Sequence, residues 1–199
     1  MSSTRVRRAR PDEWRAVGEV LARSFWDDPC WAWVCADPVR MRRHLGLALG
    51  RAVRPKIDHG WVWTVDGVPG AAVWAAPGRW RQPVREGLPS LPAFARAVGL
   101  RHVPRGLRAV QAMEHGHPRE EHWYLEILGV HPDQQGRGLG SALMQPVLDQ
   151  CRTEGLPAYL ESSTDRSALL YRRHGFEELE RFPMGPGSPL QRRMWRPAG

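Results

Sequence analysis

The feature that most constrains this fold is one continuous stretch, His122–Asp149, in which a strand pattern, a glycine-rich turn and a helix pattern follow one another. Apolar and polar residues from Trp123 to Leu128 have the alternation of a sheet strand. Gly129 then interrupts the run, which predicts a bulge or a close backbone approach. Because the first amides of a helix lack partners and the helix dipole adds about half a positive charge there, this arrangement predicts an anion-binding turn.

The turn itself is Gln135-Gly136-Arg137-Gly138-Leu139-Gly140, followed by Ser141. Glycine suits an anion site because a side chain would hold a phosphate away from the amides. A dinucleotide-binding turn has the spacing G-x-G-x-x-G and an acidic residue about twenty positions on. The spacing here is G-x-G-x-G, although Glu161 provides such an acid. A nucleotide-binding oxidoreductase that uses NAD(P) therefore stays open as an alternative.

The same turn resembles the Q/R-x-x-G-x-G/A loop of the GNAT acetyltransferase superfamily, and Tyr171–Phe176 resembles its Y-x-x-x-G-F segment. The two motifs have the order and separation that are usual in that family. Phe25–Asp37, Val73–Pro77 and Ala158–Ser163, with the Arg- and Trp-rich C-terminus, resemble puromycin N-acetyltransferase and its relatives within the family.

This resemblance implies an α/β (α+β) fold with a mixed, mostly antiparallel central sheet that is splayed at its fourth strand and flanked by helices. It also implies an enzyme that uses acetyl-CoA as co-substrate and transfers the acetyl group directly to a primary amine of a small molecule. A chain of 199 residues fits one domain, 1–199. Residues 77–118 are rich in Gly, Pro and Arg and are interpreted as a helical insertion, which in the family covers the acceptor side.

The resemblance assigns the binding of acetyl-CoA to three segments. The turn would hold the pyrophosphate, the strand before it would pair with the pantetheine arm, and Ser167 stands where many relatives carry an Asn that contacts the arm. The implied binding residues are Leu128, Gly129, Val130, Gln135, Gly136, Arg137, Gly138, Leu139, Gly140, Ser141 and Ser167.

Two residues are the catalytic candidates. By resemblance, Tyr171 would protonate the departing thiolate. Glu126 would take the proton of the amine, directly or through water, because a carboxylate within an apolar strand is costly unless it is used or paired. Its spacing from Leu128 predicts that both point to the same face of the strand.

Other residues near these motifs have weaker indications. Glu161 and Ser162 are expected to line the site, and Asp27 and Asp28 either hold an ammonium or cap a turn. Four tryptophans are candidates for an aromatic acceptor pocket, namely Trp26, Trp31, Trp33 and Trp123. The histidines at 115, 117 and 122 lack the spacing of a metal site, so no metal is expected.

The composition narrows the classes of partner. The net charge is +8, but the arginines are dispersed, which disfavours nucleic acid and leaves a non-catalytic basic binding protein as a second alternative. No apolar run approaches the length of a membrane span. Three cysteines without C-x-x-C spacing indicate a reducing cytoplasm. The sequence leaves open whether the protein forms a homodimer.

Overall fold

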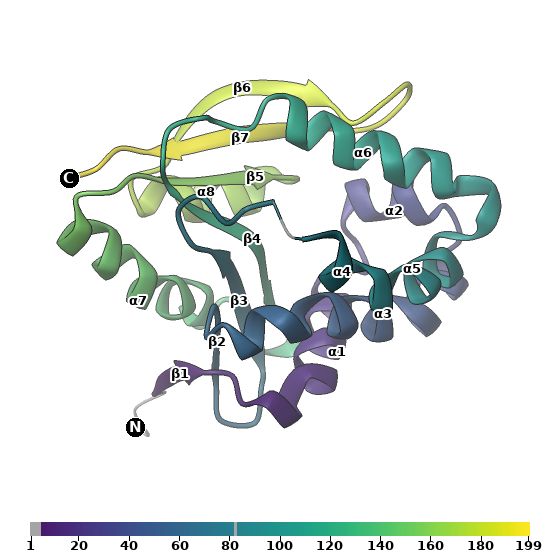
Figure 1. Cartoon of the computed structure of the whole chain (residues 1–199), viewed down its shortest axis with the longest axis horizontal. Helices are drawn as coiled ribbons and strands as arrows, with labels where there is room; N and C mark the ends of the chain where they lie inside the picture. The colour runs from purple at the N-terminus through teal and green to yellow at the C-terminus, as the bar shows by residue number, and fades with distance from the viewer. Residues whose placement is uncertain (1–4, 82) are drawn as a thin grey trace.

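The computed structural model describes residues 5–81 and 83–199. Within them, one seven-stranded sheet runs through the molecule in the order β1-β2-β3-β4-β5-β7-β6 (Figure 1). Its strands are β1 (Val6–Arg8), β2 (Val62–Val65), β3 (Gly70–Ala75), β4 (Trp123–Val130), β5 (Ala158–Ser162), β6 (Glu177–Pro183) and β7 (Leu190–Arg196). Among these described strands only β4 and β5 pair in parallel. This is the predicted mixed, mostly antiparallel sheet. The alternation of Thr4–Ala9 predicts its first strand, of which Thr4 lies outside the described residues.

Helices cover both faces of the sheet (Figure 1). On one face lie α1 (Trp14–Ser24) and α3 (Pro38–Asp58), whose buried apolar residues form a core with β2 and β3. On the other face, α7 (Leu139–Glu154) packs in a second core with β4 and β5, next to α8 (Asp165–Arg173). No helix of the described residues is long and apolar enough to cross a membrane.

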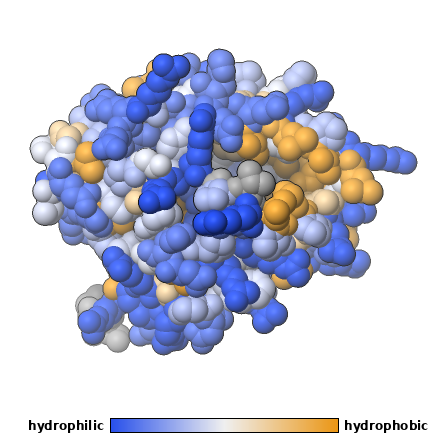
Figure 2. Space-filling model, in the orientation of Figure 1, coloured by the Kyte–Doolittle hydropathy of each residue, from blue (hydrophilic) through white to orange (hydrophobic). Residues whose placement is uncertain are grey.

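The expected helical insertion contains α4 (Val84–Gly87), α5 (Leu91–Val98) and α6 (Val103–His115). The sequence patterns at Ser90–Val98 and at Val103–Met113 each predict a helix, and α5 and α6 confirm both. Exposed apolar side chains gather over α5 and α6, on the right of Figure 2. They include Leu88, Leu91, Leu100, Leu107 and Val110.

One helix was not expected. The segment α2 (Pro29–Cys35), which reads in the sequence as an aromatic cluster, is helical because the Asp28 carboxylate accepts hydrogen bonds from the amides of Cys30 and Trp31. Short 3-10 turns join the other elements, at Pro11–Glu13, Leu88–Ser90, Leu100–His102 and Pro132–Gln134.

Candidate active site

The parallel strands β4 and β5 separate at the centre of the sheet. They pair from Trp123 opposite Ala158 to Leu125 opposite Leu160, and the ladder ends there although β4 continues to Val130. The edge of β4 beyond Leu125 therefore has no β5 partner. This opening is the splay that the resemblance implies at the fourth strand.

The irregular residue of β4 is Glu126 rather than Gly129. The β3–β4 register shifts between Val73 and Trp74, which pair with Ile127 and Leu125, so that Glu126 is the extra residue of a bulge. The bulge changes the faces of the strand, since Glu126 bonds Lys56 of α3 whereas Leu128 packs in the α7 core. The expectation that Glu126 and Leu128 share a face was wrong, because a bulge resets the alternation.

Gly129 instead marks a close approach between β4 and α1. A Cβ on this residue would lie 2.3 Å from Ser24 Oγ and 2.8 Å from Leu21 Cδ2. Its pairing with Ala71 is regular. Of the two alternatives predicted for Gly129, the close approach is the one observed.

The glycine turn connects β4 to α7 and leaves the start of the helix open. Gly136 and Gly138 have φ angles of +77° and +78°, and a Cβ on either would meet nothing within 4 Å. Gly138 is the N-cap of α7 and provides no side-chain cap, so the first amides of the helix have no side-chain acceptor from it. The residues present fit the pyrophosphate of a CoA ester, because the start of α7 has no side-chain cap from Gly138 and no atom lies within 4 Å of a Cβ placed on Gly136 or Gly138.

Neighbouring side chains fix the turn to the strand and to α8. Gln135 Nε2 donates to the Val130 carbonyl at 3.1 Å, and Ser141 Oγ lies 2.8 Å from His174 Nε2. Arg137 is exposed and donates to Gln134 Oε1 at 3.2 Å. Leu139 and Gly140 begin α7, with Leu139 packed in the core.

The Ser167 hydroxyl is already engaged at the start of α8. It lies 2.8 Å from Ser162 Oγ and from Thr164 Oγ1, and Thr164 accepts from the Ser167 amide. These contacts form the helix cap. The structure thus gives Ser167 a capping role beside the contact that the resemblance implies.

Tyr171 lies on α8 and packs in the core that α7 forms with β4 and β5. Its ring packs against Phe176 with centroids 6.1 Å apart, and burial together with the nearby Asp28 carboxylate raises the pKa of its phenol. Asp28 is buried and also accepts a hydrogen bond from Ser163 just after β5, whereas Asp27 is exposed. Asp28 therefore caps α2, and its carboxylate adds to the effect of burial in raising the pKa of Tyr171.

Glu161 is a second carboxylate near the opening and lies on β5, one residue beyond the last β4–β5 pair. Tyr124 donates to its Oε2 at 2.7 Å and Tyr159 to its Oε1 at 2.9 Å. Burial raises the pKa of Glu161 to about 7, against the lowering effect of the two tyrosine hydrogen bonds. Glu161 was expected to line the site, but the two tyrosines were missed, since only the β4–β5 register brings them together.

Glu126 has a different environment from Glu161. It forms an ion pair with Lys56, the only lysine of the chain, which is buried within α3. Burial raises the pKa of Glu126, and the Lys56 ammonium opposes that rise. The carboxylate is thus paired within the fold.

Histidines and aromatic rings enclose Glu161 and its tyrosines. His117 Nε2 lies 3.0 Å from His122 Nε2, and His122 Nδ1 lies 2.6 Å from the Glu120 carbonyl. Burial lowers the pKa of His117 to about 3 and also lowers the pKa of His122, so both rings are neutral at pH 7. No group of three metal-ligating side chains occurs among the described residues.

The expected pocket of four tryptophans is wrong. Trp26 and Trp31 pack beside the α1–α3 core, Trp33 packs near β6, and Trp123 is buried on the α7 side. Trp80 of the insertion instead stacks on His117, with centroids 3.8 Å apart. A loop residue that reaches the sheet across the fold has no local signal in the sequence.

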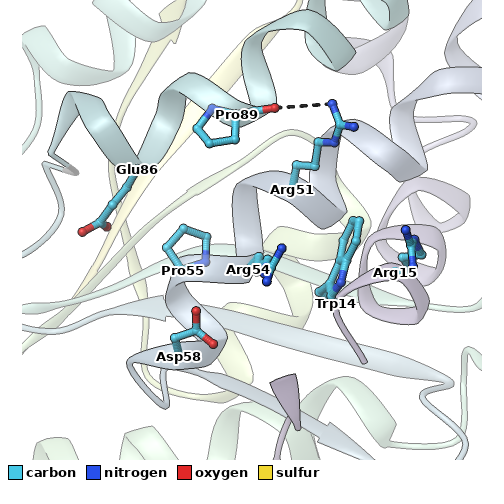
Figure 3. Close-up of a pocket in the computed structure, with 8 residues that line it drawn as sticks. All are labelled: Trp14, Arg15, Arg51, Arg54, Pro55, Asp58, Glu86 and Pro89. Atoms are coloured by element: carbon cyan, nitrogen blue, oxygen red, sulfur yellow. Dashed lines mark hydrogen bonds between the residues drawn. The ribbon is translucent and has the colours of Figure 1, made fainter. Parts of the chain in front are cut away.

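A separate groove lies on the outer side of α1 and α3, with a volume of about 730 Å³. In Figure 3, Arg51 donates to the Pro89 carbonyl on one side of the groove, and Trp14 stands between Arg15 and Arg54. Asp58 and Glu86 add opposite charge. No residue of this groove lies on β4, β5 or the glycine turn.

The site can now be compared with known proteins. The model of the acetyltransferase (GNAT) family matches residues 93–176, which include β4, the glycine turn and Tyr171. An uncharacterized N-acetyltransferase of Schizosaccharomyces pombe is 27% identical over 185 residues, or 86% of this chain and 73% of the relative. The part of the chain that carries the candidate site is thus similar to GNAT-family N-acetyltransferases.

Solved structures have the same fold. A protein described as a histone acetyltransferase and related acetyltransferase of Corynebacterium glutamicum superposes with a TM-score of 0.71 at 23% identity, over 98% of this chain and 96% of that one. An agmatine N-acetyltransferase superposes with a TM-score of 0.65 at 18% identity, over 96% and 97%. The NAD(P) oxidoreductase alternative, which needs an extended parallel sheet, is wrong, because β4–β5 is the sole parallel pair of the described strands.

Proposed function

We propose that this protein moves the acetyl group of acetyl-CoA directly to a primary amine of a small molecule. The observation that carries the proposal is the end of the β4–β5 ladder at Leu125 and Leu160, which opens the sheet beside the uncapped start of α7. A thioester held at the turn and passed through this opening would reach both Tyr171 and the carboxylates. We also propose one domain, 1–199, because a single sheet contains strands from Val6 to Arg196.

The β4 edge and the glycine turn would bind the CoA ester. The amides at Gly138, Leu139 and Gly140 point out of the helix start and would receive the pyrophosphate. Arg137 would add a charge at the rim, and Leu128 and Gly129 would offer unpaired backbone groups to the pantetheine arm. The Val130 carbonyl is occupied by Gln135, so these two residues would act by fixing the position of the turn.

Tyr171 would be the acid of the reaction. Acetyl-CoA supplies an activated carbonyl, and the thiolate that leaves needs a proton. A phenol whose pKa is raised by burial and by Asp28 stays protonated until that thiolate forms. Glu126 remains the sequence-based hypothesis for the base, directly or through water, although Lys56 already pairs with it.

The acceptor would be a small-molecule amine rather than nucleic acid. An agmatine N-acetyltransferase shares the fold, which supports a small amine as acceptor without naming it. The likeness to puromycin N-acetyltransferase rests on the sequence segments alone and stays a prediction. A peptide amine is the lesser possibility within the same chemistry.

Calorimetry of acetyl-CoA binding tests this proposal. We expect Gly138→Trp to weaken binding at least 100-fold, because an indole would fill the space in front of the amides. Gly155→Trp is the matched control, since Gly155 lies at the other end of α7 with a φ of +64° and equally open space. Equal binding by the two variants, or preference of the wild type for NAD or NADP, would contradict the proposal.

A further inference from the structure

The two carboxylates at the opening differ in what balances their charge. Glu126 is bonded to the Lys56 ammonium, whereas Glu161 is bonded to two neutral phenols, Tyr124 and Tyr159. In the described residues no ion pair to Glu161 is formed. A carboxylate that is held in place and lacks a bonded cation is suited to bind one from outside.

Other ionisable groups around Glu161 do not neutralise it. Arg193 faces it from β7, but its guanidinium bonds Glu180 and the Ala112 carbonyl at 2.8 Å. His117 and His122 are neutral because they are buried and adjacent. Above pH 7, where Glu161 is ionised, this end of the opening therefore carries one carboxylate to which no cation is bonded.

Glu161 also lies one residue beyond the last β4–β5 pair, where the two strands separate. Tyr124 and Tyr159 are direct neighbours in the parallel ladder, one residue before the last pair, and Glu161 follows Tyr159 by two positions on the same face of β5. That face is opposite the one where Leu160 packs toward α7. Glu161 keeps part of its surface exposed, while Tyr124 and Tyr159 donate to its two oxygens.

We propose that Glu161, not Glu126, binds the ammonium of the acceptor and takes its proton, and that this single free carboxylate selects monoamines over diamines. The inference rests on the proposed function for the acetyl donor. In the step, Glu161 takes one proton from R–NH₃⁺, and the free amine forms the C–N bond to the acetyl carbon as the C–S bond breaks. Tyr171 gives its proton to the thiolate and recovers one from the nitrogen, which becomes the amide.

Selection for a monoamine follows from the charge count. A second ammonium would meet neutral His117, Arg193 and the Lys56 ion pair, none of which can accept it. Trp80, Tyr124 and Tyr159 pack around His117 next to Glu161, and aromatic surroundings suit an apolar or aromatic body behind the ammonium. A molecule such as 2-phenylethylamine has these properties, and agmatine does not.

The test compares Glu161→Gln with the wild type in two separate measurements. In calorimetry we expect the variant to bind 2-phenylethylamine at least 10-fold more weakly, with 2-phenylethanol bound equally by both proteins. In turnover of 2-phenylethylamine, followed as release of the CoA thiol from pH 6 to 9, we expect kcat/KM to fall at least 100-fold. We also expect the rise of the wild-type profile near pH 7 to disappear, and Glu161→Asp to restore part of the activity.

Three further measurements test the inference. Agmatine is expected to be a substrate at least 10-fold poorer than 2-phenylethylamine in kcat/KM. Loss of the pH 7 rise in Glu126→Gln but not in Glu161→Gln, or equal amine binding by wild type and Glu161→Gln, overturns the inference. Acetyl-CoA affinity is expected to be the same in wild type and Glu161→Gln; failure of the wild type to bind acetyl-CoA overturns the proposed function instead, because amine binding is measured without it.

Discussion

The two sides of the β4–β5 opening are built in different ways. The side of the glycine turn is one short segment of chain, open to solvent, that offers backbone amides through Gly136 and Gly138. The opposite side is assembled from side chains of β4, β5, α3 and the insertion, such as Glu161, Tyr124 and His117. A backbone site is defined by local conformation, whereas a side-chain site depends on the whole fold.

This difference has a consequence for substitutions. In the turn, a side chain at Gly138 meets no atom within 4 Å but is strained by the φ of +78°, a cost that Gly155→Trp shares at a φ of +64°. The difference between these two variants therefore falls on binding. On the other side, buried groups bond one another, so removing one leaves a polar partner unpaired. Binding and stability should therefore separate on the turn side and be coupled on the carboxylate side.

The largest expected effect concerns the residue between the two sides, Tyr171. We expect Tyr171→Phe to lower kcat by about 100- to 1,000-fold, the range for loss of a general acid, with the acetyl-CoA affinity changed less than about twofold. Steady-state kinetics and calorimetry measure these quantities. Phe176→Leu, which alters the ring that packs on Tyr171, is the control and should lower stability with little change in kcat. Equal kcat in wild type and Tyr171→Phe would assign the acid role elsewhere.

The next effect is on stability. Lys56→Met leaves the Glu126 carboxylate without its cation, and we expect a loss of about 3 kcal/mol in the free energy of unfolding. The double variant Lys56→Met/Glu126→Gln should recover most of this loss. Urea unfolding measures both, and Arg152→Ala, which breaks an exposed ion pair to Asp149, should change stability by less than about 1 kcal/mol. Similar losses from the buried and the exposed pair would contradict the comparison.

The turn side could be predicted from the sequence because its information is local. The glycines, the helix start and the strand before them are adjacent in the chain, and the structure has them at Gly136, Gly138 and α7 as expected. The sheet was predicted on the same basis, from alternation and from the two family motifs. Local patterns specify elements whose partners lie next to them in the sequence.

The carboxylate side could not be predicted in the same way. The bulge at Glu126 arises from pairing with β3, and no residue type at that position indicates it. The Lys56 partner lies 70 positions away, and the tyrosines that hold Glu161 meet only through the β4–β5 register. For Asp28, the sequence left two alternatives, capping a turn or holding an ammonium. The structure decides for capping, and the capped segment is the unexpected helix α2.

A third prediction uses the pH dependence of stability. Glu161 has a pKa of about 7 in the folded chain and 4.5 as its ordinary value, so between pH 4.5 and 7 the unfolded chain releases a proton that the folded chain keeps. Stability therefore falls as pH rises through this window, by about 3 kcal/mol in total from this group. His117, with a folded pKa of about 3 against 6.5, acts with the opposite sign from pH 3 to 6.5, so the wild type must be compared with Glu161→Gln at each pH. Parallel profiles of urea midpoints in the two proteins would show that Glu161 does not titrate near pH 7.

The smallest expected effect lies at the rim of the turn, where Arg137 is exposed and bonded only to Gln134 among the described residues. We expect Arg137→Ala to weaken acetyl-CoA binding by about two- to fivefold at low salt, and by less at high salt, because an exposed charge is screened by ions. Arg152→Ala, at the far end of the same helix, is the control and should leave the affinity unchanged. Calorimetry at two salt concentrations separates this charge from the backbone amides, whose contribution depends little on salt. A loss as large as that of Gly138→Trp would mean that the turn binds through a side chain after all, and that its local, backbone character is not what distinguishes it from the carboxylate side.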